Sequence, residues 1–162
     1  MTAPHPTPSQ KLSELGVKLP APPNPVAAYL PAVVHEQTVL VSGQIPMVEG
    51  SLKFKGSVPS EVSEADAVRA ARHCALNALA VVDSVVPGGL DAVDQILRLG
   101  VFVQSDAGFH GQPAVANGAS EFMQEVFGEK GRHARAAVGV IALPLGATVE
   151  IELMARFSPI ER

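Results

Sequence analysis

Hydrophobic and polar positions change their period several times along this chain, and each period indicates a different element. Residues 30–34 and 38–42 are apolar and β-rich and are separated by a polar trio at 35–37, which predicts two strands joined by a tight turn. Glycine and proline at 43–46 end the second strand. Residues 52–55 predict a short additional strand, whose lysines suit the edge of a sheet.

Two helices are predicted by apolar positions that recur every three or four residues. The first begins at a Ser63 cap and ends at Pro87. Its apolar face is formed by Val68, Ala71, Ala75, Ala78, Leu79, Val82 and Val86. The second begins at Pro113, which suits a first helical turn, and ends at Gly128. Its apolar face is formed by Val115, Ala119, Phe122 and Val126.

Three more strands are predicted in the second half of the chain. Residues 96–103 are β-formers and are followed by a loop at 104–112. Residues 134–143 and 148–157 predict a closing hairpin around a turn at 144–147. In the last strand apolar residues alternate strictly with Glu150, Glu152, Met154 and Arg156, so one of its faces is buried and the other is polar.

The element order ββ(β)αβαββ predicts an α+β fold in which two helices cover one face of a sheet. The opposite face carries Arg135, Ala137 and Gly139 or their neighbours, and no segment is left to cover it. Small, partly apolar residues on an uncovered sheet face favour contact with other subunits.

The N-terminal head is rich in proline, because seven of the 14 prolines lie within the first 25 residues. We expect residues 1–23 to be a largely non-helical, partly disordered extension, apart from one helical turn at 10–15. The globular domain is then expected to span residues 24–162.

Composition excludes several classes of protein. The net charge of −4, without a run of Lys or Arg, argues against binding of duplex nucleic acid. The sequence has neither an apolar stretch of membrane-spanning length nor a signal peptide, so we expect a cytoplasmic protein with no membrane contact. A single cysteine, Cys74, forms no internal disulfide. The low share of charged residues, 17%, indicates either surface buried between subunits or an alanine-rich composition.

General catalytic motifs are missing: the chain has no nucleotide-binding loop, no nucleophile elbow and no zinc-protease motif. Its five histidines are scattered. We expect His73 to be an ordinary helix residue and Cys74 to be a small packed side chain. The sequence therefore predicts neither a metal site nor a cofactor.

Two charged residues stand out on the predicted strands. Arg135 is flanked by Ala, Val and Gly, and its guanidinium is costly to bury without an anion. That anion is either an internal Asp or Glu or the carboxylate of a ligand. Glu150 would have a raised pKa if partly desolvated, and would then handle a proton or orient water. The alternative, a solvated strand face, suits Glu152 better than Glu150.

In the predicted closing hairpin, Arg135 faces about position 156 and Glu150 about position 141. The two residues are then roughly 20 Å apart. If both act on one ligand, they come most simply from different subunits.

These residues together resemble the signature of the RidA family, also called YjgF or L-PSP. The matching segments are Tyr29, Ser42 to Pro46 (SGQIP), Val101 to Val103, Asn117, Ala134-Arg135, Leu143-Pro144 and Val149 to Glu152. The 13-residue step from Tyr29 to Ser42 and the 15-residue step from Arg135 to Glu150 are also those of the family. The resemblance covers about residues 24 to 157.

The resemblance implies a chorismate-mutase-like fold and a homotrimer whose sheets form a central barrel, with three clefts between subunits. It implies that Arg135 grips the carboxylate of a 2-imino or enamino acid. Glu150 would position the water that hydrolyses this substrate to a 2-keto acid and ammonia. The side chains of Tyr29, Ser42 and Asn117 would line the cleft, and backbone groups at Gly43 and Ala137 would contact the ligand.

The chain also departs from the family pattern. Ala137 replaces the usual cysteine, His133 replaces the usual proline, and the loop at 104–112 is longer. These differences indicate a divergent branch with a different pocket. They leave open a non-catalytic binder of small carboxylates as the alternative function. The endoribonuclease label of the family fits poorly with the net charge of −4 and with the lack of a basic groove or histidine pair.

Overall fold

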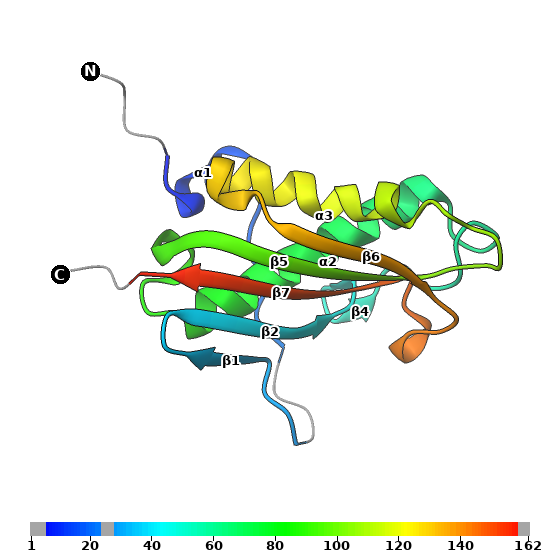
Figure 1. Ribbon diagram of the computed structural model, residues 1–162, viewed down its shortest axis with the longest axis horizontal. Helices are drawn as coiled ribbons and strands as arrows, with labels where there is room; N and C mark the ends of the chain where they lie inside the picture. Colours follow the sequence, from blue (N-terminus) through cyan, green and yellow to red (C-terminus); the bar gives the residue numbers. More distant parts are fainter. Residues whose placement is uncertain (1–5, 24–27, 159–162) are drawn as a thin grey trace.

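A five-stranded mixed sheet, in the order β1-β2-β7-β5-β6, carries both long helices on one face (Figure 1). The computed structural model describes residues 6–23 and 28–158. The strands of this sheet are β1 (Ala32–His35), β2 (Thr38–Gln44), β5 (Val93–Gln104), β6 (Ala134–Val140) and β7 (Val149–Phe157). The helices are α2 (Glu64–Val85) and α3 (Gln112–Phe127). The predicted α+β fold class is therefore confirmed.

Strand pairing in the sheet is antiparallel except between β5 and β6, which run parallel and are connected by α3. Two short strands, β3 (Met47–Val48) and β4 (Ser51–Leu52), form a separate two-stranded sheet. The short edge strand predicted at 52–55 is wrong in its extent, because only Leu52 of this segment belongs to β4. Farther along, Lys55 forms an isolated antiparallel bridge with Ala147.

The closing hairpin predicted for residues 134–157 is also wrong. β5 lies between β6 and β7, and each of them pairs with β5. The reason is that α3 returns the chain parallel to β5, which places β6 at the edge of the sheet. The 3₁₀-helix η3 (Pro144–Gly146) then carries the chain across the end of β5. β7 fills the position between β5 and β2, where both of its edges are paired.

The helices follow the predicted pattern closely. Ser63 caps α2, since its hydroxyl accepts the Asp66 amide at 3.1 Å. The predicted face of this helix is buried except for Val68, which is half-buried. Gly118 of α3 lies against the carbonyl of Val68, where a Cβ would collide with the backbone. A residue without a side chain therefore lets α2 and α3 cross closely.

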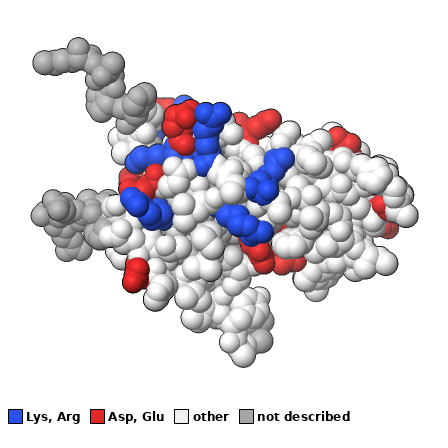
Figure 2. All heavy atoms as spheres, viewed as in Figure 1, with Lys and Arg blue, Asp and Glu red and all other residues white. Residues whose placement is uncertain are grey.

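The other face of the sheet has no helix over it. Its exposed apolar residues include Val33, Leu40 and Val138. In Figure 2 this face is toward the viewer; charged residues lie on its end near the two chain termini and in its middle, and uncharged residues cover the rest. The strand register places Ala136 and Val138 here, while Arg135 and its alternating neighbours face the helices. The uncovered face thus carries the neighbours of Arg135, not Arg135 itself.

The N-terminal head contains a helix, α1 (Pro8–Glu14), where the sequence predicts a largely non-helical extension with one turn at 10–15. A capping box between Thr7 and Gln10 starts the helix, and Pro8 lies in its first turn, where proline costs no hydrogen bond. Leu12 is buried, and the Ser9 amide donates to Asp91 Oδ1 at 2.9 Å. Residues 1–5 of the predicted head, and residue 24 as the predicted start of the domain, lie outside the described residues. No helix in the described ranges is long and apolar enough to cross a membrane.

Candidate functional site

Arg135 lies on the edge strand β6 and points toward α3. Its Nη1 donates to Asn117 Oδ1 at 2.9 Å and to Ser120 Oγ at 3.1 Å. Across residues 6–23 and 28–158, none of the ion pairs involves this guanidinium. Of the two interpretations of Arg135, pairing with an internal acid is therefore not found in the described structure. The guanidinium of Arg135 is held by neutral oxygens at a sheet edge, so its positive charge is suited to an external anion.

Ser120 was not predicted as part of the site. It lies three residues after Asn117, on the same face of α3, and is buried. Its Oγ lies 3.0 Å from Nε2 of His133, and Nδ1 of the same ring lies 2.6 Å from the Gly131 carbonyl oxygen. The helical spacing of Asn117 and Ser120 is the signal in the sequence from which it could have been found.

Ala137 follows Arg135 by two residues on the same side of β6 and packs partly against the core. Gly139 continues this row and leaves room for the Gln112 side chain, which donates to the Phe109 carbonyl at 2.7 Å. The long loop predicted at 104–112 therefore closes over the far end of the row that begins at Arg135.

Glu150 belongs to a second group of residues, on the uncovered face. Its carboxylate lies against the backbone of Gly43 in β2, where a Cβ would collide with Oε1. A bulge in the pairing of β2 with β7 lies at this point. Burial raises the pKa of Glu150, and the like charge of Glu152 raises it further. In this environment the Glu150 carboxylate therefore binds a proton more readily than a solvated carboxylate does.

Ser42 directly precedes Gly43 of this second group. The Ser42 hydroxyl donates to the Leu30 carbonyl at 2.6 Å, which ties β2 to the segment that carries Tyr29. The Tyr29 residue is 58% exposed. Asn77 of α2, whose role was not predicted, donates to the carbonyls of Ile45 and Met47 at 3.0 Å each. These bonds fix the chain directly after Gly43.

The described chain therefore contains two half-sites, which we call the arginine group (Asn117, Ser120, His133, Arg135 and Ala137) and the glutamate group (Tyr29, Ser42, Gly43 and Glu150). In register, Arg135 lies beside Leu99 and Glu150 lies beside Phe102. The two Cα atoms are thus separated by roughly 10 Å along the strands and roughly 10 Å across them. Together these give roughly 14 Å, less than the roughly 20 Å expected from the sequence, because the assumed hairpin is wrong.

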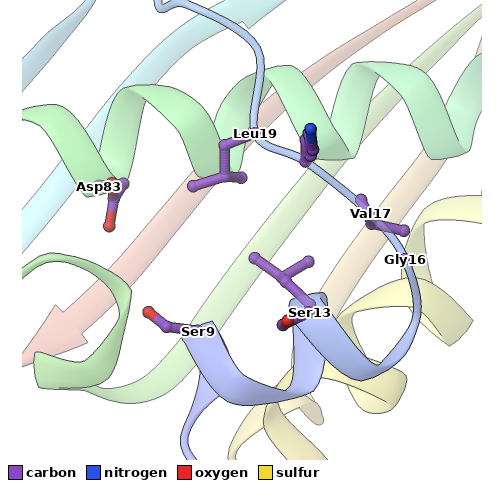
Figure 3. A pocket seen from close by; sticks show the side chains of 8 residues that line it. Ser9, Ser13, Gly16, Val17, Leu19 and Asp83 are labelled. Carbon is purple, nitrogen blue, oxygen red and sulfur yellow. The ribbon is translucent and has the colours of Figure 1, made fainter.

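Two cavities of the described residues lie away from both half-sites. The cavity in Figure 3, of about 390 Å³, lies between α1, the segment after it and Asp83 of α2. A second cavity, of about 750 Å³, lies between residues 6–11 and the end of α3. Both are lined by other residues than the two groups. Neither cavity therefore brings the arginine group and the glutamate group together.

Two other chemically notable residues match their predicted structural roles. Cys74 is fully buried, its Sγ lies 3.4 Å from the Val149 carbonyl oxygen, and burial raises its thiol pKa. His73 is half-buried with its ring 5.8 Å from that of Phe54, and burial lowers its pKa. Among the described residues no three His, Cys, Asp or Glu side chains gather as metal ligands would.

Comparison with curated proteins finds relatives along most of the chain. Protein TCP17 of Trypanosoma cruzi is 40% identical over 144 residues, which cover 88% of this chain and 89% of TCP17. The 2-iminobutanoate/2-iminopropanoate deaminase of Dermatophagoides farinae is 31% identical over 137 residues, which cover 84% of this chain and 91% of the deaminase.

Solved structures share the fold. The protein Atu1372 of Agrobacterium tumefaciens is 41% identical, with a TM-score of 0.86 and 91% coverage of both chains. The structure of E. coli TdcF with bound serine is 26% identical, with a TM-score of 0.60, and covers 85% of this chain and 94% of TdcF.

A family model described as "YjgF/chorismate_mutase-like, putative endoribonuclease" matches residues 9–157. This match spans both half-sites and begins within α1. The chain belongs to the YjgF family, which is the RidA family that its strand and site residues resemble.

Proposed function

We propose that this protein hydrolyses 2-imino or enamino acids to 2-keto acids and ammonia, in clefts between copies of the chain. The observation that carries the proposal is the pair of half-sites: an arginine without an acidic partner among the described residues, and a half-buried glutamate with a raised pKa. The relative from Dermatophagoides farinae, named a deaminase of this type, supports the reaction class. TdcF, whose structure holds serine, supports a small ligand with a carboxylate.

The roles of the two groups follow from their chemistry. Arg135 would bind the substrate carboxylate, and Glu150 from a neighbouring copy would take a proton from water as its oxygen attacks the imine carbon. This proton then passes to the nitrogen, which gives a carbinolamine. Glu150 next takes the proton of the carbinol hydroxyl and delivers it to the nitrogen as the carbon–nitrogen bond breaks, so ammonia leaves and a keto group remains. No cofactor takes part in these reaction steps.

The assembly we propose is a homotrimer, with the uncovered sheet faces turned toward one another. Val33, Leu40 and Val138 would be buried in it, since apolar patches of this kind mark contacts between subunits. Sedimentation analysis should show a trimer for the wild type. Leu40→Asp should yield smaller species with unchanged far-ultraviolet circular dichroism, whereas Ser13→Asp on α1 should not change the assembly.

The test of the reaction generates an imino acid in place from an amino acid and an oxidase, and follows its conversion to keto acid. Wild-type protein should accelerate the conversion, and Arg135→Ala should abolish the acceleration. Arg132→Ala is the matched control, because that exposed arginine pairs with Glu129 three residues away. Conversion at the buffer rate with wild-type protein would refute the deaminase.

The same assay separates two other functions. A non-catalytic binder of carboxylates, favoured by the structure of TdcF with serine, would show a higher melting temperature with pyruvate but no accelerated hydrolysis. The endoribonuclease named in the family description is disfavoured by the net charge of −4. RNA cleavage by rigorously purified protein that persists in Arg135→Ala would establish that activity instead.

A further inference from the structure

The polar groups behind Arg135 form a chain of hydrogen bonds whose direction is fixed by chemistry. A carbonyl oxygen only accepts, so His133 Nδ1 donates to Gly131 at 2.6 Å. In the neutral ring Nε2 is then an acceptor, and the Ser120 hydroxyl, 3.0 Å away, donates to it. The lone pairs of Ser120 Oγ remain to accept Nη1 of Arg135 at 3.1 Å.

This chain occupies one end of the guanidinium. The two hydrogens of Nη1 are directed to Ser120 Oγ and Asn117 Oδ1. The remaining N–H groups, two on Nη2 and one on Nε, have no hydrogen-bond partner within residues 6–23 and 28–158. Nη2 and Nε together form one edge of the planar fork, and such an edge matches the two oxygens of a carboxylate.

The elements that supply this chain are parts of the folded scaffold. Ser120 is buried in α3, and Gly131 is buried at the end of the 3₁₀-helix η2 (Gly128–Gly131), two residues before His133. Arg135, by contrast, is an exposed side chain on an edge strand. A free arginine of this kind loses considerable rotamer entropy when a ligand immobilises it. Holding its Nη1 end in advance reduces that loss.

We propose that Ser120 and His133 are positioning residues that turn the Nη2–Nε edge of Arg135 toward the ligand carboxylate. The inference rests on the proposed function, because it takes Arg135 as the carboxylate anchor. In this proposal His133, which stands where the family usually has proline, orients Arg135 through Ser120. It also makes Ser120 a partner of that histidine, with the Gly131 carbonyl setting the protonated nitrogen of the ring.

A spectroscopic experiment tests this chain of hydrogen bonds without any ligand. Nitrogen-15 NMR of the full-length protein at alkaline pH should show a protonated Nδ1 and an unprotonated Nε2 in His133. Ser120→Ala should shift the Nε2 resonance, because it removes the donor to that atom. Ser84→Ala, which removes a serine hydroxyl bonded to the Val81 carbonyl of α2, should leave the resonance unchanged. A neutral ring protonated on Nε2 would overturn the inference.

A binding test reads the consequence for Arg135, with pyruvate as the probe in calorimetric titrations. Ser120→Ala and His133→Phe should each raise the Kd roughly three- to tenfold. The double variant should bind pyruvate no more weakly than the weaker-binding single variant, because both substitutions break the same chain of hydrogen bonds. Ser120→Thr, which keeps the hydroxyl, and the control Ser84→Ala should bind like the wild type.

The outcomes separate this inference from the proposed function. If Ser120→Ala and His133→Phe bind pyruvate within twofold of the wild type while Arg135→Ala loses binding, the positioning role is refuted and the anchor role of Arg135 stands. If Arg135→Ala binds pyruvate as tightly as the wild type, the anchor role fails, and the positioning role fails with it.

Discussion

Arg135 and Glu150 point to opposite faces of one sheet. Their register neighbours on β5, Leu99 and Phe102, are three residues apart, and an odd separation along a strand reverses the direction of the side chain. Arg135 accordingly bonds to α3, while Glu150 lies against Gly43 on the uncovered side. A ligand that contacts both groups must therefore lie between two molecules.

Mixing of inactive variants should restore activity if each cleft takes Arg135 from one copy and Glu150 from the next. In a mixed trimer of Arg135→Ala and Glu150→Gln chains, one of the three interfaces has both native residues. Random 1:1 assembly after joint refolding should thus give roughly a quarter of the wild-type rate in the imine assay.

The control for this experiment mixes Arg135→Ala with the double variant Arg135→Ala/Glu150→Gln, which can form no native cleft. It should remain inactive after the same refolding. A mixture of the two single variants that stays at the control rate, with trimers present in sedimentation analysis, would show that the residues do not share a cleft.

The acidic limb of the pH profile should depend on Glu152. Burial and the charge of Glu152 raise the pKa of Glu150, and a general base works only when ionised. Activity should therefore fall as the pH drops through this raised pKa. Glu152→Gln removes the like charge, so its kcat/KM profile should extend to lower pH. Glu121→Gln, an exposed change on α3, should not move the limb, and a shift of the Glu152→Gln limb to higher pH would contradict the assignment.

The stability of the fold should also depend on the protonation of Glu150. Here the protonated form is the favourable one, whereas catalysis needs the ionised form. A folded-state pKa above the unfolded one means that the protonated form of Glu150 is favoured in the fold, and this contribution is lost as the pH rises through the folded pKa. Glu150→Gln mimics the protonated form. It should raise the melting temperature relative to the wild type at about pH 8 and have little effect at about pH 4. Calorimetric scans at both pH values check this, and a lower melting temperature at pH 8 would contradict it.

Gly43 provides the space in which the Glu150 carboxylate lies. Gly43→Ala would place a methyl group on Oε1, and the flexible glutamate would move away while the backbone remains in place. We expect hydrolysis to fall at least tenfold, since a misplaced base loses its reach to water, with a small change in melting temperature. Full activity of Gly43→Ala would show that the contact between Gly43 and Glu150 is not needed.

The helix in the head should contribute to the core. Leu12 is 4% exposed, whereas Leu15 at the end of the same helix is 38% exposed. Leu12→Ala should destabilise the protein by about 2–3 kcal/mol in urea unfolding. The matched Leu15→Ala should cost less than about 1 kcal/mol. Equal effects of the two substitutions would mean that α1 does not pack as described.

The sequence predicted the elements better than their neighbours in space. Periodicity identified α2, α3 and the strands of the five-stranded sheet, because it records which face of each element is buried. It could not show that β7 lies between β2 and β5, because β6 and β7 are adjacent along the chain and their connection resembles a hairpin turn. The head was underestimated for a related reason: proline opens a helix as readily as it breaks one, and only the burial of Leu12 shows which applies.

The residues of the candidate site also differ in how clearly the sequence indicates them. Arg135 and Glu150 stood out because each is a charged residue in an unusual strand setting. Ser120, His133 and Asn77 act through bonds to partners that lie far away in the sequence or on backbone atoms. The Asn77 side chain, for example, bonds to carbonyl groups about thirty residues away. Apart from the helical spacing of Asn117 and Ser120, no periodicity in the sequence encodes such contacts.

Strand β6 forms an open edge of the sheet and carries only one charged residue, Arg135, among alanine, valine and glycine. Natural edge strands are usually guarded by lysine, proline or a bulge, because an unguarded edge pairs with another chain. If copies assemble as we propose, a dissociated copy would be prone to irreversible aggregation through this edge. The working lifetime of the protein should then be set by how rarely copies separate, and it should lengthen with protein concentration.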